Sequence, residues 1–332
     1  MSQLNCPITV LGGGAWGTAL AVHLARYNDR VSLWEYSAAV LQELRTDRQN
    51  RSALPNVFLP KNVTVYGDIK EAVIGSHEII VATTSTALLQ VLRDCRDALD
   101  PAASICWACK GLDEATSRTF DQVIPDIVGE RALAVLSGPS FPEEVSNNLP
   151  TAVALGYNDS EFADRLRMRF NHGLFHIVPT SDIIGVQLGG VGKNVIAVAS
   201  GYSEGIMAGT NALSALITIG LGDLANLTVA LGGKRETIQG LAGVGDLFLT
   251  CSTRRSRNYR FGFALAHGED QSQVRSQIGQ VIEGVDNLER LLRLANRVGV
   301  ELKICRFVDR IIKEPFRDRR EAIREMTQYF FR

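Results

Sequence analysis

One stretch near the N-terminus has the residue types that bind a phosphate-containing ligand. An apolar run, Ile8–Leu11, leads into GGGAWG at residues 12–17, and an Ala- and Leu-rich pattern typical of a helix follows. In such a turn the first glycine permits tight turning, the second lets a diphosphate approach the backbone, and the third lets the helix pack closely on the strand. An acid, Glu35, ends the next predicted strand about 20 residues further on, where it can bind a ribose hydroxyl. The pattern predicts a dinucleotide-binding site that includes Gly12, Gly14, Gly17 and Glu35.

Three residues further along the chain have the types needed to move a proton. Lys193 lies in an Ile-, Val- and Ala-rich helical pattern, where burial of an unpaired ammonium would be costly. Asp246 is isolated among small apolar residues, and we expect it to be the partner of Lys193. Lys110 directly follows a predicted buried strand, at the kind of strand end where the sites of open α/β sheets lie. The alternatives are a purely structural buried ion pair for Lys193 and a solvated side chain for Lys110.

Two glycine-containing stretches and one basic stretch are further candidates. Gly138-Pro139-Ser140 follows another strand end, and GQVIEG at 279–284 is an apolar, acidic segment bounded by glycines, typical of a loop held close to something. The basic stretch TRRSRNYRF at 253–261 precedes a predicted helix. Arginine forks and helix N-termini both favour phosphate oxygens, so this stretch predicts an anion site. Its alternative is an exposed, solvated loop.

Composition excludes several classes of partner. The chain has 332 residues, 45% hydrophobic and 21% charged, with a net charge of −1, which argues against nucleic acid or an anionic membrane surface as a partner. We see no apolar run that approaches a membrane span and no signal pattern, and therefore expect a cytoplasmic protein. The six cysteines are expected to be reduced thiols, and no metal site is expected, since neither Cys106/Cys109 nor His172/His176 has suitable geometry.

The elements that must position these residues change character along the chain. Strands and helices alternate in the first half, which predicts a Rossmann-like, doubly wound, mostly parallel sheet. After about Asp182 the apolar residues recur at helical spacing, which predicts an all-helical domain. We therefore expect a dinucleotide-binding domain over 1–183 and a substrate-binding, catalytic domain over 184–332. The expected strands are 8–11, 31–35, 63–66, 78–83, 103–109, 132–136, 151–155 and 175–178. The expected helices include 38–47, 85–99 capped by Ser85, 117–127, 160–170, 185–200, 211–231, 259–267, 285–298, 304–313 and 319–330.

These stretches together resemble the NAD(P)-dependent glycerol-3-phosphate dehydrogenase family in its bacterial form. The resemblance is collinear over nearly the whole chain. It rests on the segments GGGAWGTALA, WACKGL, SGPSFPEEV, LPTAVAL, IGVQLGGVGKNVIAVASG, GVGDLFLTC, SRNYRFG and GQVIEG. The family usually has Ser at the position of Ala15 and, in bacteria, Arg near Ile219.

The resemblance implies a role for each residue that matches a family motif. Lys193 would exchange the proton, with Asp246 as its partner and Lys110 orienting the carbonyl. Substrate contacts would come from Lys110, Gly138, Ser140, Lys193, Asp246, Ser256, Arg257 and Asn258. Cofactor contacts would come from Ala15, Trp16, Lys110, Pro142, Arg257, Val281 and Glu283, beside Gly12, Gly14, Gly17 and Glu35.

The implied reaction is reduction of dihydroxyacetone phosphate to sn-glycerol 3-phosphate, a precursor for glycerophospholipid synthesis. NAD or NADP would be the cofactor, and Glu35 with no arginine directly after it favours NAD. The sequence sets no oligomeric state, and a homodimer is left open. Two alternatives remain: a 3-hydroxyacid or 6-phosphogluconate-type dehydrogenase, and a regulator that senses NAD(H) without turnover. The segments around Lys110 and Ser256–Asn258 argue against the first, and Lys193 with Asp246 argues against the second.

Overall fold

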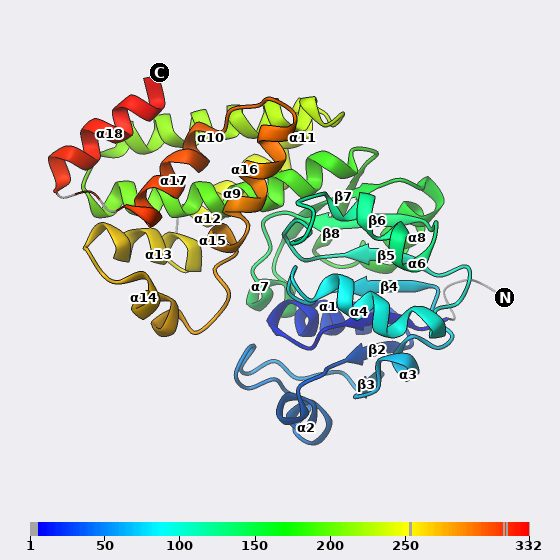
Figure 1. The fold of residues 1–332 in the computed structure, drawn as a ribbon. Helices are drawn as coiled ribbons and strands as arrows, with labels where there is room; N and C mark the ends of the chain where they lie inside the picture. The colour runs from blue at the N-terminus through cyan, green and yellow to red at the C-terminus, as the bar shows by residue number, and fades with distance from the viewer. Residues whose placement is uncertain (1–5, 252–253, 315, 317, 332) are drawn as a thin grey trace. The chain divides into compact units, whose positions relative to one another are not determined.

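A computed structural model describes residues 6–251, 254–314, 316 and 318–331. The chain divides into two compact units (Figure 1). The first contains the described residues up to Cys109 together with Phe120–Ile183, and the second contains Lys110–Thr119 and the described residues from Ile184 onward. The segment Lys110–Thr119, which the sequence-based ranges placed in the first domain, therefore packs with the second unit.

The first unit is built on one eight-stranded sheet of order β3-β2-β1-β4-β5-β6-β7-β8. Every neighbouring pair is parallel except β6 and β7, which are antiparallel. The strands are β1 Ile8–Leu11, β2 Val31–Trp34, β3 Val63–Tyr66, β4 Glu78–Val81, β5 Ser104–Trp107, β6 Leu133–Ser137, β7 Thr151–Tyr157 and β8 Phe175–Thr180. The outward order from β1 to β3 on one side and from β4 onward on the other confirms the doubly wound, mostly parallel prediction.

Helices and short helical turns connect these strands. They are α1 Ala15–Ala25, α2 Ala38–Thr46, α3 Ile69–Val73, α4 Leu88–Cys95 with the 3₁₀ turn η2 Arg96–Ala98, α5 Phe120–Val123, α6 Pro125–Val128, α7 Pro142–Ser146 and α8 Ser160–Phe170. Two sequence expectations are wrong here. The helix expected over 117–127 is broken before Pro125, which has no N–H to continue the ladder, and α4 begins after Ala87 rather than at a Ser85 cap.

In the described residues of the second unit, every element is helical (Figure 1). The elements are α9 Ile183–Gly205, α10 Thr210–Ala230, α11 Arg235–Gln239, the π-helical turn η3 Leu241–Gly245, α12 Asp246–Cys251, α13 Arg257–Ala266, α14 Gln271–Ile278, α15 Glu283–Asp286, α16 Leu288–Arg297, α17 Lys303–Lys313 and α18 Arg319–Phe331. Buried residues of α9, such as Val195 and Ile196, share one hydrophobic cluster with Phe307 of α17. This packing confirms the predicted all-helical second half.

Two helices of this unit are long and apolar enough, by length and composition, to cross a membrane. They are α9 and α10, whose most apolar windows are 89% and 33% buried. The sequence expectation concerned uninterrupted apolar runs. Lys193 and Asp223 interrupt the runs in α9 and α10, which meet the criterion only in their mean hydropathy. The core helix of a water-soluble protein meets the same criterion, and the burial of α9 is that of a core helix.

Candidate active site

The glycine turn joins β1 to α1 and offers backbone to a ligand. Gly12 has a φ of +117° and lies against the Ala82 carbonyl, where an added Cβ would be 2.9 Å from the oxygen. A Cβ on Gly17 would collide with the Gly12 carbonyl oxygen, whereas Gly14 faces open space. No side chain caps the N-terminus of α1, which begins at Ala15. An open backbone surface at an uncapped helix N-terminus fits a diphosphate.

Glu35 is engaged with the protein's own backbone. Its side chain is buried, and the residue is 5% exposed. One carboxylate oxygen accepts a hydrogen bond from the Gly13 N–H at 2.9 Å, and the other accepts one from the Ser37 N–H at 2.7 Å. The Asn50 amide, to which the sequence analysis gave no role, donates to the Gly13 carbonyl at 2.7 Å. Glu35 and Asn50 therefore stabilise the glycine turn through hydrogen bonds to the Gly13 backbone. Ribose binding by Glu35 stays a prediction.

Gly138, Ser140 and Pro142 lie at the carboxyl end of β6 and the start of α7. Gly138 has a φ of +151°, and an added Cβ would be 2.9 Å from the Cα of Val153. The Ser140 hydroxyl donates to the Gly138 carbonyl at 3.1 Å, and Pro142 is the first residue of α7. A side chain at Gly138 is thus excluded by both conformation and space.

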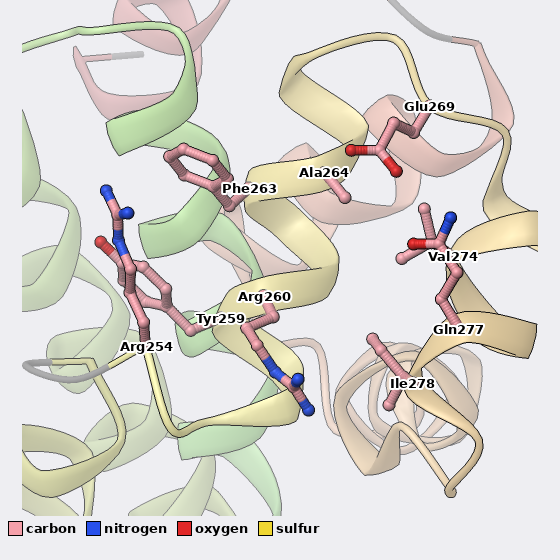
Figure 2. A pocket seen from close by; sticks show the side chains of 9 residues that line it. All are labelled: Arg254, Tyr259, Arg260, Phe263, Ala264, Glu269, Val274, Gln277 and Ile278. Carbon is pink, nitrogen blue, oxygen red and sulfur yellow. The ribbon is translucent and has the colours of Figure 1, made fainter.

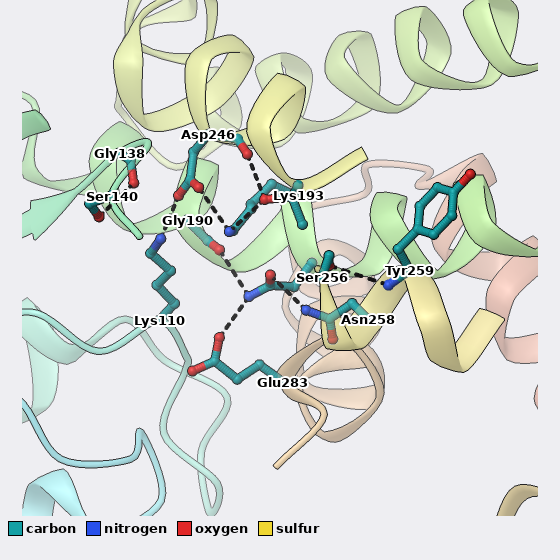
Figure 3. Close-up of polar contacts among 12 residues, drawn as sticks. Lys110, Gly138, Ser140, Gly190, Lys193, Asp246, Ser256, Asn258, Tyr259 and Glu283 are labelled. Atoms are coloured by element: carbon teal, nitrogen blue, oxygen red, sulfur yellow. Dashed lines mark hydrogen bonds and ion pairs between the residues drawn. The ribbon is translucent and has the colours of Figure 1, made fainter. Parts of the chain in front are cut away.

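In the second unit, two lysines share one carboxylate (Figure 3). The Nζ of Lys193 lies 2.8 Å from Oδ1 of Asp246, and the Nζ of Lys110 lies 2.5 Å from Oδ2 of the same residue. Asp246 is 1% exposed and Lys193 8% exposed. The predicted pairing of Lys193 with Asp246 is present, and Lys110 joins it because its segment packs with the second unit.

The Lys193–Asp246–Lys110 cluster contains two ammonium groups and one carboxylate in a largely buried setting, and the Glu283 carboxylate also acts on Lys193. Burial lowers the pKa of the Lys193 ammonium below its ordinary value; the Asp246 carboxylate opposes that shift, and the Lys110 ammonium adds to it. A lysine with a lowered pKa gives up and takes back a proton more readily than an ordinary lysine. Two ammonium groups placed in this way can stabilise an oxygen that becomes negative beside them.

A second network joins Glu283, in the segment 279–284, to Asn258 at the start of α13; Figure 3 labels these two residues, and the Asn194 side chain bonds to both. The Asn194 amide donates to the Glu283 carboxylate at 2.8 Å, and its carbonyl oxygen accepts from the Asn258 amide at 2.9 Å. The Asn258 carbonyl oxygen accepts from the Gly284 N–H at 2.9 Å. Two residues predicted for the site, Asn258 and Glu283, are therefore held by a buried amide that neighbours Lys193 in sequence.

The remaining predicted residues of this unit lie at the same two segments. Ser256 is the N-cap of α13, and its hydroxyl accepts from the Tyr259 N–H at 3.3 Å. The half-buried Arg257 donates to the Gln280 side chain at 3.0 Å. Val281, in the same loop as Gln280, is 39% exposed. The alternative to the predicted anion site, an exposed and solvated loop, therefore does not hold for Ser256 and Asn258, which are buried.

Thr250 and Asn194 belong to this site by contact, although the sequence analysis assigned them no role. Lys193 Nζ donates to the Thr250 hydroxyl at 2.8 Å, and that hydroxyl donates to the Asp246 carbonyl at 2.6 Å. Thr250 lies one helical turn after Asp246, so the i, i+4 spacing was the available signal. For Asn194 the signal was a second polar residue inside the apolar pattern of α9.

A separate pocket lies between α13 and α14, with a volume of about 370 Å³ (Figure 2). Its lining includes Arg254, Arg260, Phe263 and Ile278. Arg254, Tyr259 and Arg260 belong to the predicted basic stretch, but none of the residues assigned a substrate or cofactor contact lines this pocket, so it does not mark the candidate active site. Among the described residues, no group of three His, Cys, Asp or Glu side chains is arranged to hold a metal ion.

The comparisons with known proteins cover the same two halves. Residues 7–163 match the family model described as NAD-dependent glycerol-3-phosphate dehydrogenase N-terminus, and residues 182–322 match its C-terminus. A Photobacterium profundum protein named glycerol-3-phosphate dehydrogenase (NAD(P)+) is 42% identical over 321 residues, 96% of this chain and 95% of that protein.

A crystal structure of glycerol-3-phosphate dehydrogenase from Coxiella burnetii is also similar. It is 39% identical, with a TM-score of 0.93 over 98% of this chain and 99% of that chain. The enzyme of that name from Saccharomyces, 21% identical with a TM-score of 0.86, shares the fold. The chain belongs to the NAD-dependent glycerol-3-phosphate dehydrogenase family.

Proposed function

We propose that this protein reduces dihydroxyacetone phosphate to sn-glycerol 3-phosphate with NADH or NADPH, and runs the reverse oxidation. Membership of the family makes it an NAD(P)-dependent oxidoreductase that acts on a CH–OH group. The observation that carries the proposal is the Lys193–Asp246–Lys110 cluster, since a carbonyl reduction needs one proton donor and one group that orients the carbonyl.

The residues around the glycine turn fit a dinucleotide. Gly14 leaves open space and α1 is uncapped, so the N–H groups of Ala15 and Trp16 are suited to hold a diphosphate; the missing Ser hydroxyl at Ala15 removes no backbone donor. Pro142, Arg257, Val281 and Glu283 would complete the contacts by family resemblance. When bound, the nicotinamide supplies the hydride.

Lys193 is proposed as the residue that exchanges the proton. In the reducing direction its ammonium gives a proton to the carbonyl oxygen as that oxygen becomes an alkoxide, and the neutral amine takes it back in oxidation. Asp246 holds Nζ in place and Thr250 fixes it from a second side, at 2.8 Å each. The second lysine on the carboxylate, Lys110, is proposed to orient and polarise the carbonyl.

Ser256, Arg257 and Asn258 are proposed to hold the substrate phosphate. They stand at the start of α13, a ten-residue helix whose N-terminal backbone dipoles favour an anion. Arg257 supplies the charge and the fork geometry, while the buried Asn258 is fixed by Asn194 and the Gly284 backbone. Gly138 and Ser140 are proposed as further substrate contacts by family resemblance.

One assay tests the function and both alternatives. Oxidation of NADH and of NADPH is followed with dihydroxyacetone phosphate, with 3-hydroxyacid precursors and with sugar phosphates. Of these candidate substrates, we expect turnover only with dihydroxyacetone phosphate. Turnover with a 3-oxoacid, or cofactor binding with no turnover on any substrate, would overturn the assignment in favour of the dehydrogenase or the sensor alternative.

Three further statements are part of the proposal. The protein acts in the cytoplasm, and its product feeds glycerophospholipid synthesis. Residues 1–183 and 184–332 act as a cofactor domain and a substrate domain, except that the segment Lys110–Thr119 belongs with the second unit. Homodimer formation stays a prediction, to be measured by light scattering of the purified protein.

A further inference from the structure

The carboxylate of Asp246 projects from the end of an unusual helical turn. Residues Leu241–Gly245 form the π-helical turn η3, whose backbone bonds span five residues: Gly245 N–H donates to the Gly240 carbonyl at 3.1 Å, and Asp246 N–H to the Leu241 carbonyl. Such turns are rare, contain one residue more than an α-helical turn, and frequently occur at functional sites. The position of this turn decides where the Asp246 side chain points.

Helix α9 fixes this turn through a backbone contact at a glycine. A Cβ added to Gly189 would lie 2.6 Å from the Ala242 oxygen and 2.9 Å from its carbonyl carbon. The obstacle is main chain at the buried Ala242, and no rotamer change would relieve it. From the other side, a Cβ on Gly243 would collide with the carbonyl of Ile238 in α11. The turn is thus held between α9 and α11 at two glycines.

Gly189 lies one helical turn before Lys193, so both residues occupy the same face of α9. The backbone contact at Gly189 and the ion pair at Lys193 therefore link the same two elements at neighbouring points. Lys193 reaches Asp246 Oδ1 at 2.8 Å and Thr250 at 2.8 Å, distances that leave little room for a shift of the turn.

We propose that Gly189 is a positioning residue, which sets the place of Asp246, and through it of Lys193 and Lys110, by allowing α9 to approach the peptide between Ala242 and Gly243. This inference rests on the proposed function, because the roles of the two lysines are part of it. It goes further in assigning a site function to a residue that touches neither substrate nor cofactor.

The principal test is Gly189→Ala. Relief of the contact requires a shift of roughly 0.5–1 Å, and a misplacement of that size lowers turnover by about 10²-fold. We expect kcat to fall by about that factor while KM for NADH changes less than threefold. The alkaline limit of the reduction rate should also move to lower pH, because a Lys193 ammonium that is less well paired with Asp246 loses its proton more easily.

Two matched glycine variants separate positioning from stability. Gly222→Ala in α10 places its Cβ in open space, and Gly220→Ala meets the flexible Ile196 side chain at 2.8 Å. We expect wild-type kcat and pH profile from Gly222→Ala, and a lower Tm with a nearly unchanged pH profile from Gly220→Ala. If Gly189→Ala resembles either control in kcat and pH profile, the positioning role is wrong.

A second pair of variants keeps the test decisive if Gly189→Ala does not fold. Val244 is 41% exposed within the π turn, and Val244→Gly adds backbone freedom there. Val244→Ala, which loses the same two methyl groups, is its control. We expect Val244→Gly to have a several-fold lower kcat than Val244→Ala, and equal values would overturn the proposal. A wild-type protein that is inactive on dihydroxyacetone phosphate would instead contradict the proposed function itself.

Discussion

At the scale of single residues, the charges around Asp246 set the pKa of Lys193 and so the pH dependence of the reaction. Reduction needs its ammonium form, and oxidation needs its neutral amine. Because burial lowers the pKa of Lys193, reduction should weaken and oxidation should gain as pH rises through that lowered value, below the range of an exposed lysine. Lys193→Ala should lower kcat by about 10²–10⁴-fold and abolish this opposite pH dependence.

The measurement is kcat in both directions between pH 6 and 10, with Lys61→Ala, an exposed lysine of the first unit, as control. Asp246→Asn should give a smaller loss and an alkaline limit at lower pH, because the carboxylate that raises the pKa of Lys193 is gone. A folded Lys193→Ala protein with wild-type turnover would remove this residue from the mechanism.

Arg257 offers a second residue-scale prediction. Arg257 is the first residue of α13, and its guanidinium donates a hydrogen bond to the Gln280 side chain. It is the charged member of the proposed phosphate site. Arg257→Ala should raise KM for dihydroxyacetone phosphate by about 10- to 100-fold, since loss of a charge-assisted hydrogen bond costs roughly 1.5–3 kcal/mol. Unphosphorylated dihydroxyacetone should be a poor substrate that the change leaves unaffected. The control is Arg260→Ala, one turn along the same helix; equal KM increases from both variants would indicate a general field effect instead.

A site residue could be predicted where the sequence around it has a pattern that indicates its partner, and not otherwise. Lys193 and Asp246 were predictable as partners because each is a lone charge among apolar residues, which burial would penalise unless they met. The addition of Lys110 to the same carboxylate was not, because strand-end position alone left its segment with the first half of the chain. Asn50 was missed for a different reason. A single Asn in a loop has no sequence pattern that indicates its partner, and its contact with the Gly13 carbonyl is set by the fold.

At the scale of elements, α1 contains a buried histidine that should make stability depend on pH. His23 is fully buried against Phe170 and Phe175, and its Nε2 lies 2.8 Å from the Phe170 carbonyl oxygen. Burial lowers the pKa of His23 from 6.5 to about 4. Between pH 6.5 and about 4, His23 is therefore mostly neutral in the folded protein and mostly protonated in the unfolded chain.

The sign and size of the effect follow from this difference. The full stability is present above pH 6.5 and is lost as pH falls from 6.5 to about 4, in total about 3 kcal/mol of unfolding free energy. His23→Leu should remove most of this dependence, and the Phe170 carbonyl still accepts the His172 N–H. Urea unfolding at pH 7.5, 6 and 5 measures it, with the exposed His267→Leu as control. A parallel loss in wild type and His23→Leu would place the pH dependence in other groups.

Elements whose pattern is local were predictable, and those set by tertiary contact were not. β1, β2, β4, β5 and β6 are buried on both faces, as strands inside a largely parallel sheet are, whereas the edge strands β3 and β8 alternate buried and exposed residues. Both patterns can be recognised in the sequence. The helix expected over 117–127 failed at a local signal, because apolar periodicity was given more weight than Pro125. The π turn η3 had no local signal, since LAGVG is typical of a loop until Gly189 and Ile238 hold it from two sides.

At the scale of the whole molecule, cofactor binding should appear as a gain in stability of the folded chain. A ligand at about 100 times its Kd raises the unfolding free energy by about 2.7 kcal/mol, and a tenfold weaker ligand at the same concentration gives about 1.4 kcal/mol less. The difference between the shifts in Tm with NADH and with NADPH thus reports cofactor preference without any turnover.

We expect NADH to stabilise the protein more than NADPH at equal concentration and fixed ionic strength. A carboxylate at the end of β2 repels a 2′-phosphate, and the nearby arginines are mostly engaged: Arg48 with the Pro60 and Val63 carbonyls, Arg51 with Asp47. Glu35→Gln should narrow the preference, and the exposed Glu71→Gln should leave it unchanged. Because Glu35 also accepts the Gly13 and Ser37 N–H groups, its variant should unfold at a lower Tm without cofactor, so the ligand-induced shifts are compared. If NADPH stabilises the wild type more, Glu35 serves only to brace the glycine turn, and an arginine such as Arg51 reads the phosphate.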